Sequence, residues 1–506
     1  MTTTFSKCGL DLVQAHTQTN SFPAETRRLH IRSRLAELNT LIAALTAERQ
    51  SLQAESDSIM YPVLSLPPEI TMEVFRCCLP SDSMPRPSPF KAPLLLAQIC
   101  RQWRRIALNT PNLWRSLVFG DESSVEILKL WLSRAGNLPL NYSLHCTNPS
   151  RAGALIETII LHSHQWQDVS FGIPLTSFPK LDMRYQSLPM LRQISLDIHQ
   201  RASDDAVPDT ITIQNAPLLR EVHISTLPDV KFDIPWHQLT TLTLCQSVDL
   251  MECISLLREC PGLVHLVVST MGSAATHTAA PLTLNLLESF TSNLEDVSIM
   301  EHLTLPRLER LPVTGTVGFQ HPTILKSFIR RSACALQFLS LSVSDIVSDT
   351  LNLCLRTAPA SVVELELIWH ERGSPTGALF NVLQPMDVLP QLKKLRFRGG
   401  RLFDEDYNNL VAMLHSRRDS SSGRAALDSL AVNLKMYSGL HNRRYMPKIS
   451  TITQLRALAA DGVKIKFTMS GRSNYSTHVP DFLKLDFALG LWLYDLYATF
   501  PWSGSP

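Results

Sequence analysis

The apolar residues of this chain recur with three different periods in three successive stretches. Between Arg27 and Met60 they recur every seven residues, which is the stripe of a two-stranded coiled coil. The members of this stripe are Ile31, Leu35, Leu38, Ile42, Leu45, Leu52 and Ile59. Arg49 and Ser56 interrupt it. We predict one long helix that either forms a homodimer through residues 31–59 or packs on the chain's own next domain.

The second stretch, residues 61–118, has the spacing of short amphipathic helices separated by proline. Pro67 and Pro68 suit the first turn of a helix, and Pro80 ends it. A second helix carries Ile99 and Trp103 on its apolar face and several arginines on its polar face. Helices this short cannot bury so much apolar surface among themselves. Some of it should face a partner or the rest of the chain.

This second stretch resembles an F-box. The matching pieces are Leu66-Pro67-x-Glu69, Val74-Phe75, Ile99-Cys100-x-x-Trp103 and Leu113-Trp114, and their flanks resemble the F-box-like proteins of fungi. The resemblance implies docking on a Skp adaptor, and through it on a cullin ligase scaffold. The adaptor-binding residues that it implies are Leu66, Pro67, Ile70, Val74, Ile99, Trp103 and Trp114. A proline-rich insert, Ser81–Pro93, departs from the family pattern between the two helices.

In the third stretch, residues 119–435, the motif apolar-x-x-apolar-x-apolar recurs, with helical segments between many copies. The copies begin at Trp166, Leu191, Leu219, Leu239, Leu263, Leu294, Leu308, Leu336, Val362, Leu392 and Leu427. One strand and one helix cannot bury their apolar faces alone, so this pattern predicts a stacked array. It resembles leucine-rich repeats without the Asn or Cys that normally follows the motif. The alternative is an α/β domain with an open parallel sheet.

The expected fold class is therefore α/β, an N-terminal helical F-box followed by a leucine-rich-repeat-like solenoid with a parallel sheet. The expected segments are a disordered N-terminus (1–26), a coiled-coil-like helix (27–60), the F-box (61–118), the solenoid (119–435) and a C-terminal capping region (436–506). In that last region an apolar helix face between Phe482 and Tyr497 would close the open end of the array. Its aspartates argue against a membrane-surface helix.

Side chains alternate across a strand, so the third, fifth and seventh positions of each motif face the open side of the sheet. In two neighbouring units this alternation predicts Glu364 opposite Lys394 and Glu366 opposite Arg396. Opposite charges at such positions attract each other. We therefore interpret Lys394 and Arg396 as members of cross-strand pairs rather than as a basic binding patch.

Three other residues on the same face have no charged partner in this pattern. They are Phe338, Ile368 and Arg398. An aromatic, an aliphatic and an arginine side chain on one exposed face are typical of an interface hot spot. The sequence therefore predicts a target-binding site at these three residues.

Composition and motifs narrow the function. The formal net charge of +2 gives no argument for nucleic-acid binding, and no apolar run reaches the roughly 20 residues of a membrane span. The ten cysteines fit no zinc or redox spacing, which favours reduced thiols in the cytoplasm, the nucleus or both. His145, Cys146 and two nearby histidines likewise fit no zinc pattern, and the acidic run Asp404–Asp406 is interpreted as a solvated loop.

The sequence also contains no phosphate-binding glycine loop, nucleophile elbow or metalloprotease motif. We expect no catalytic residues, no metal and no cofactor. The resemblance implies a substrate-recognition subunit of a Skp–cullin–F-box ubiquitin ligase whose repeats bind a target protein. The alternative is a leucine-rich-repeat interaction scaffold that is not part of a ubiquitin ligase. An enzyme with its site on the repeat loops is the third reading, and no motif favours it.

Overall fold

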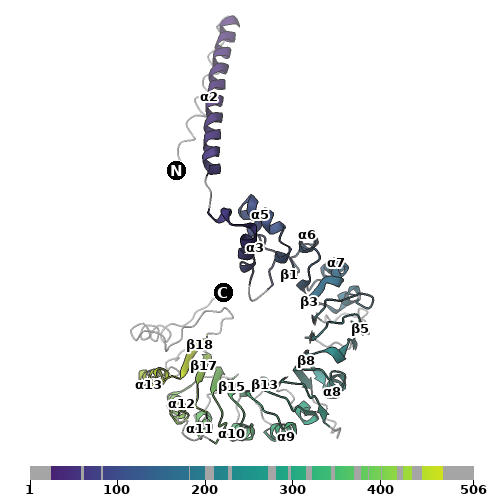
Figure 1. Ribbon diagram of the computed structural model, residues 1–506, viewed down its shortest axis with the longest axis vertical. Coiled ribbons are helices and arrows are strands. Elements are labelled where there is room, and N and C mark those ends of the chain that lie inside the picture. The colour runs from purple at the N-terminus through teal and green to yellow at the C-terminus, as the bar shows by residue number, and fades with distance from the viewer. Residues whose placement is uncertain are drawn as a thin grey trace.

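The computed structural model places a long helix, a group of short helices and a large parallel sheet one after another along the chain (Figure 1). The structure describes residues 24–58, 62–80, 84–181, 183–199, 210–225, 231–271, 281–293, 298–314, 322–343, 348–369, 378–385, 387–399, 402–418, 425–435 and 447–470. The sheet together with the segments that connect its strands accounts for most of the described chain. The fold is thus mixed α/β with its helices concentrated at the N-terminus and along one face of the sheet.

The heptad stripe lies on α2 (Ala24–Ser58), a single helix of 35 residues that projects from the rest of the molecule. It begins three residues before the predicted start, and Ile59 lies outside the described residues. Every side chain from 25 to 56 is exposed. The alternative in which this helix packs on the following domain is therefore wrong for these residues.

Short helices follow α2. They are η1 (Pro62–Ser65), α3 (Pro68–Cys77), α4 (Leu96–Ile99), α5 (Arg101–Leu108) and η2 (Pro111–Leu113). The sequence predicts one helix where α4 and α5 lie, because the apolar spacing runs through both. Cys100 interrupts it with an extended backbone, and its thiol accepts the N–H of Trp103 at 3.4 Å as the N-cap of α5.

All neighbouring strands of the main sheet pair in parallel, and their order across the sheet is their order along the chain. These strands are β1 (Ser116–Gly120), β2 (Leu140–His145), β3 (Trp166–Pro174), β4 (Gln193–His199), β6 (Glu221–Ile224), β8 (Thr241–Asp249), β9 (His265–Met271), β11 (Ser289–Asn293), β13 (Arg310–Thr314), β14 (Phe338–Val343), β15 (Glu364–Trp369), β16 (Lys394–Gly399), β17 (Ser429–Lys435) and β18 (Lys464–Ser470). Two small parallel pairs accompany them, β5 (Thr210–Thr212) with β7 (Lys231–Asp233) and β10 (Leu282–Thr283) with β12 (Leu303–Thr304).

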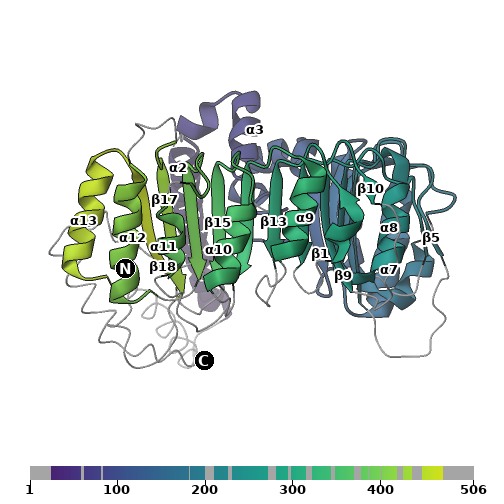
Figure 2. The ribbon, with the colours of Figure 1, turned by 90° about the horizontal axis from the view of Figure 1, so that it is seen from below.

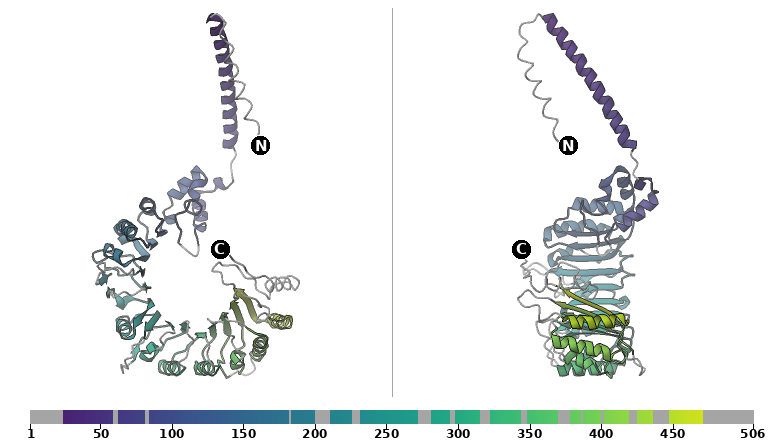
Figure 3. Two further views of the ribbon diagram at one scale, coloured as in Figure 1. Left: turned by 180° about the vertical axis from the view of Figure 1, so that it is seen from behind. Right: turned by 90° about the vertical axis from the view of Figure 1, so that its left-hand side faces the viewer.

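The sheet curves into an arc whose concave side is formed by the strands (Figures 1 and 2). The outer side carries α6 (Val125–Ala135), α7 (Pro149–Ile159), α8 (Leu250–Arg258), α9 (Pro322–Ser332), α10 (Ser348–Thr357), α11 (Ala378–Leu383), α12 (Asp404–Ser416) and α13 (Ile449–Ala460). These outer helices contact the 3₁₀ helices η3 (Ile160–Gln165), η4 (Leu175–Lys180) and η6 (Ser298–His302). Another 3₁₀ helix, η5 (Trp236–Gln238), precedes β8. The two further views show the same arc from behind and from its edge (Figure 3).

The core lies between the strands and the outer helices. In ten of the eleven predicted motif copies all three apolar side chains are buried, as the copy Leu392, Leu395 and Phe397 illustrates. In the copy predicted at Leu294, Leu294 and Val297 lie outside the described residues, and the third residue, Ile299, lies in η6 rather than in a strand. The strand there is β11, seven residues earlier, where Phe290 is buried and Ser292 takes the third apolar position. A serine at that position hides the strand from an apolar pattern.

The sheet extends beyond the predicted solenoid at both ends. At its start β1 begins within the predicted box, and at its end β18 lies within the predicted cap. The predicted apolar helix between Phe482 and Tyr497 lies outside the described residues. The acidic run predicted as a loop is instead the first turn of α12, where the Asp406 carboxylate accepts the N–H of Phe403 at 2.8 Å.

Candidate functional site

The short helices leave apolar side chains exposed. Ile70 and Val74 of α3 are 51% and 42% exposed, and Ile99 at the end of α4 is 54% exposed. Residues four apart lie on the same helix face, so Ile70 and Val74 point the same way. Thr71 and Phe75 on the other face of α3 are buried. This amphipathic arrangement leaves an apolar face available to a partner.

Several contacts fix the helices that carry this surface. Phe75 and Trp103 pack edge to face with their ring centroids 5.0 Å apart, which joins α3 to α5. The Gln102 side-chain amide donates to the carbonyl of Leu64 at 2.9 Å and ties η1 to α5. Trp103 and Leu66 are half-buried and Pro67 is exposed. Six of the seven predicted adaptor-binding residues therefore have accessible surface.

Trp114 is the seventh, and it has no exposed surface. Its indole N–H donates to the carbonyl of Ala107 at 2.9 Å. Its ring packs edge to face on Trp131, at 4.8 Å between centroids, beneath the guanidinium of Arg134. The prediction that it contacts an adaptor is wrong for this conformation. Trp114, Leu117 and Phe119 have the spacing of the strand motif, which was the signal in the sequence for β1.

The proline-rich insert packs on the start of the sheet. The carbonyl of Pro85 accepts the N–H of Val118 at 3.0 Å, so residue 85 is held against β1. Phe90 in this insert is 83% exposed, and Leu95 just after it is 40% exposed. Sequence reasoning missed both as surface residues. Phe90 belongs to no periodic pattern, and Leu95 has the spacing of an inward-facing residue.

The concave face of the sheet is a second candidate surface. The predicted register is confirmed, because Glu364 lies opposite Lys394 and Glu366 opposite Arg396. The ion pairs nevertheless run diagonally. Arg396 binds Glu364 at 3.0 Å, and Arg398 binds Glu366 at 3.4 Å. Long arginine side chains reach such diagonal neighbours. The prediction that Arg398 has no charged partner is therefore wrong.

The aromatic member of the predicted target-binding site is covered. Phe338 is 5% exposed, and the guanidinium of Arg310 on the neighbouring strand lies 4.1 Å from its ring centroid. This cation–π contact lies on the concave side, away from the apolar core. Ile368 is half-buried and Arg398 is exposed. Three neighbouring strands bring the three residues to one face, but Phe338 is not accessible there.

The last strands of the concave face carry further basic side chains. Lys394 of β16 and Lys464 and Lys466 of β18 are exposed. The register places Lys394, Ser429 and Lys464 in one row across three strands. Sequence reasoning missed the two lysines of β18, because that strand lies in the region predicted as a cap. This end of the concave face is a positively charged surface.

The described residues include histidine, cysteine and carboxylate side chains, the usual ligands of metal ions. Among them no group of three or more His, Cys, Asp or Glu side chains is placed to hold a metal ion. The Cys146 thiol donates to the Asp121 carboxylate at 2.8 Å, and burial raises its pKa to about 11, opposite to what a nucleophile requires. Within the described ranges, every helix is too short or too polar to cross a membrane.

A comparison with family models identifies an F-box-like domain at residues 63–120. The match includes α3, α4, α5 and strand β1, and it lies two residues from each boundary of the predicted box. The exposed apolar surface is therefore a surface of this F-box-like domain. A search of curated proteins found no match to the chain.

Proposed function

We propose that this chain is the substrate-recognition subunit of a Skp–cullin–F-box ubiquitin ligase. F-box domains typically dock on the Skp adaptor of such ligases, and the F-box-like domain here exposes Ile70, Val74 and Ile99. Apolar side chains left in water on a domain that is otherwise packed are typical of a binding surface. This exposed face is the observation that supports the proposal most directly.

In this proposal the parallel sheet with its outer helices is a degenerate leucine-rich-repeat solenoid. In support, each strand follows the previous one across the sheet in chain order, with strands inside the arc and helices outside. The concave face binds the target protein, and the chain carries out no catalysis of its own. Its contribution is proximity, because it raises the effective concentration of the target at the ligase. Such a receptor acts in the cytoplasm, the nucleus or both.

The second candidate function is an interaction scaffold that joins no ligase. The proline-rich insert favours it, because the insert packs on β1 through Pro85 and exposes Phe90 beside the helices of the box. In that case the F-box-like domain would not bind an adaptor. Its helices would serve only as the structural start of the sheet. Co-purification with the Skp adaptor separates the two functions.

The first prediction tests adaptor docking with Ile70→Asp and Ile99→Asp combined. Both side chains are exposed in the free protein, so the folded state tolerates the charges, whereas an apolar interface does not. An unpaired charge buried on binding costs on the order of several kcal/mol, enough to abolish a micromolar complex. A pull-down of the Skp adaptor should therefore fail for this variant.

Leu353→Asp is the matched control, since Leu353 lies on the outer helix α10 and is 44% exposed. It should bind the adaptor as the unmodified chain does. Circular dichroism establishes that all three proteins are folded. Adaptor capture by the folded double variant would refute Ile70 and Ile99 as the docking surface. Failure of the unmodified chain to capture the adaptor would refute the proposed function in favour of the scaffold.

A further inference from the structure

The apolar stripe of α2 is exposed along its whole length. Leu35, Ile42 and Leu45 are 53%, 59% and 57% exposed. No other described part of the chain covers them, because every side chain from 25 to 56 is exposed. An apolar stripe on an isolated helix marks a surface that another helix covers.

The seven-residue spacing assigns each side chain of α2 a place in a coiled coil. One row of the seam, conventionally the a positions, contains Leu35, Ile42, Arg49 and Ser56. The other row, the d positions, contains Ile31, Leu38, Leu45 and Leu52. The flanking g positions, which decide pairing and orientation, contain Arg27, Arg34, Leu41, Glu48 and Glu55.

The charges of α2 are divided between its two halves. Residues 25–41 contain four arginines and two glutamates, whereas residues 42–58 contain one arginine and three acidic residues. The first half is therefore positive and the second half negative. Two parallel copies would place like charges side by side. Two antiparallel copies place the positive half of each helix on the negative half of the other, and they also oppose the helix dipoles.

The charged residues at the flanking g positions also favour the antiparallel orientation. With Ile42 of one copy opposite Leu38 of the other, Arg34 lies next to Glu48 and Arg27 next to Glu55. Each of these pairings occurs twice in the symmetric dimer. In a parallel dimer the g position of Arg27 instead meets the e position of Arg32 in the second copy. Arg34 also binds Glu37 within its own helix at 2.8 Å, on the side of the helix away from the seam.

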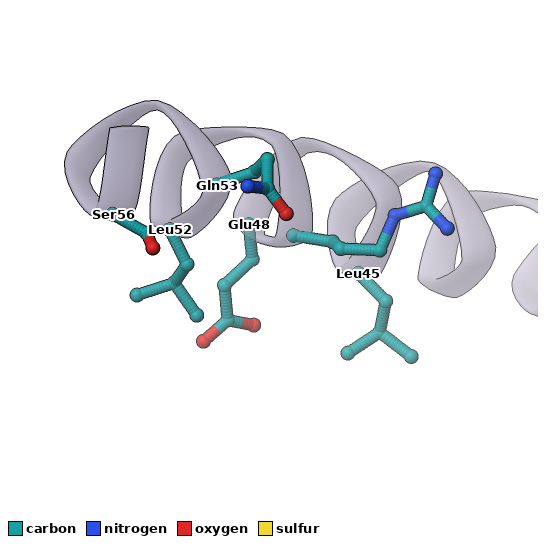
Figure 4. Close-up of a pocket in the computed structure, with 6 residues that line it drawn as sticks. Leu45, Glu48, Leu52, Gln53 and Ser56 are labelled. Atoms are coloured by element: carbon teal, nitrogen blue, oxygen red, sulfur yellow. The ribbon is translucent and has the colours of Figure 1, made fainter. Parts of the chain in front are cut away.

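A shallow depression on α2 fits the same arrangement (Figure 4). Leu45, Glu48, Arg49 and Leu52 line it, together with Gln53 and Ser56. The first four have the spacing i, i+3, i+4 and i+7, which is the hole that receives one side chain of the facing helix in a coiled coil. In the antiparallel alignment the incoming side chain is Ile31. In a parallel dimer it would be Arg49, a charged group in an apolar seam.

We propose that α2 binds the α2 of a second copy of this chain as an antiparallel two-stranded coiled coil, with Ile42 opposite Leu38. The proposal does not depend on the ubiquitin-ligase function. Both helices lead into their F-box-like domains at their C-terminal ends. The antiparallel pair therefore holds the two bodies at opposite ends of a rod about 50 Å long.

Charge reversal on the full-length chain tests both the dimer and its orientation. The variant Glu48→Arg with Glu55→Arg places arginine against Arg34 and Arg27 of an identical copy. The variant Arg27→Glu with Arg34→Glu places glutamate against glutamate. In light scattering each variant alone should dissociate at a concentration at least about tenfold above that of the unmodified dimer. An equal mixture of the two should restore the dimer, because every flanking pair is then complementary.

Glu37→Arg with Asp57→Arg is the matched control. It makes the same change in net charge as the first variant but outside the seam, so it should remain dimeric. A monomeric full-length chain at micromolar concentration would overturn the dimer and point to a helix from a different protein as the occupant. Variants that stay dimeric alone, or a mixture that fails to associate, would overturn the antiparallel orientation. A trimer or tetramer would overturn the two-stranded pairing.

Discussion

Asp121 holds the end of β1 against the turn between β2 and α7 through one carboxylate. It accepts the Cys146 thiol and the hydroxyl of Thr147, each at 2.8 Å, and also the N–H groups of Thr147 and Asn148. These four donors hold the pKa of the Asp121 carboxyl well below its usual range, with the Cys146 hydrogen bond contributing most. Asn148 in turn caps α7 with its side chain. One ionised group thus links the end of β1 to the end of β2 and the start of α7.

The second prediction concerns Asp121→Asn and its dependence on pH. The folded-state pKa lies below that of the unfolded chain, so the carboxylate stabilises the fold fully above the unfolded value of about 4. That contribution is lost as the pH falls through the folded-state pKa. Urea unfolding should therefore show a less stable variant at pH 7, with the difference narrowing below about pH 4. A difference that stays constant from pH 7 to pH 3 would contradict this account.

Single residues also decide where sequence reasoning failed. The register of the concave face followed from alternation alone, because a strand has a strict period of two. The diagonal ion pairs did not follow, since they depend on how far an arginine reaches along its neighbour. Phe338 was predicted to be accessible because its row faces outward. Arg310, which covers its ring, lies on a neighbouring strand, and a local sequence pattern does not reveal such a contact.

Among the elements, two outer helices end in an arginine that binds backbone carbonyls of the preceding unit. Arg331 at the end of α9 donates to the carbonyls of Leu303 and Met300. Arg417, just after α12, is buried and donates to the carbonyls of Leu383 and Leu389 at 2.8 and 2.9 Å, and to two more between them. Each guanidinium joins one helix–strand unit to the unit before it.

The third prediction is that Arg417→Lys destabilises the sheet domain. A lysine ammonium cannot satisfy four carbonyls arranged around a planar guanidinium, and unsatisfied buried groups cost roughly 1–3 kcal/mol. Chemical denaturation should show a loss of about 2 kcal/mol. The neighbouring substitution Arg418→Lys is the control, since Arg418 forms an exposed pair with Asp461 and should change stability little. Equal effects of the two substitutions would disprove the role assigned to Arg417.

The helices and strands themselves were largely predictable where the apolar pattern was unbroken. It identified α2, α3 and ten strand motifs, because a helix or strand with one apolar face repeats its apolar residues with a period of 3.5, 3.6 or 2. The prediction failed where a single serine or glycine stood at an apolar position of a strand, or where a helix ended although the apolar spacing continued. Ser292 hid β11, and Cys100 ended a helix inside a continuous apolar run. β18 was missed because Gly462 stands where the first apolar residue of the motif belongs.

At the scale of the whole molecule, the strands line the concave face of the arc in the order in which they occur along the chain. The basic end lies on β16 and β18, where Lys394, Lys464 and Lys466 are exposed. The acidic side chains nearest to them along the sheet, Glu364 and Glu366, are already paired with arginines. In the proposed receptor this end would attract an acidic segment of the target protein.

The fourth prediction tests that surface with Lys464→Glu and Lys466→Glu combined. Affinity purification with mass spectrometry, with the proteasome inhibited, should show the loss of a set of proteins that the unmodified chain captures. The Skp adaptor should be retained, because it binds a distant domain. The control is Lys326→Glu with Arg330→Glu on the outer helix α9, where both side chains are exposed. Equal losses for the two variants, or none for the lysine variant, would exclude the basic end as the target site.

Strand β1 has a practical consequence for how this protein can be divided or recombined. It lies within residues 63–120 of the F-box-like domain, yet its hydrogen-bonding partner is β2 of the sheet. An isolated box would carry an orphan strand, and an isolated sheet would present the bare edge of β2, which invites aggregation. The F-box-like domain of this chain is therefore not an exchangeable cassette. A cut that keeps β1 paired with β2 must fall before Ser116.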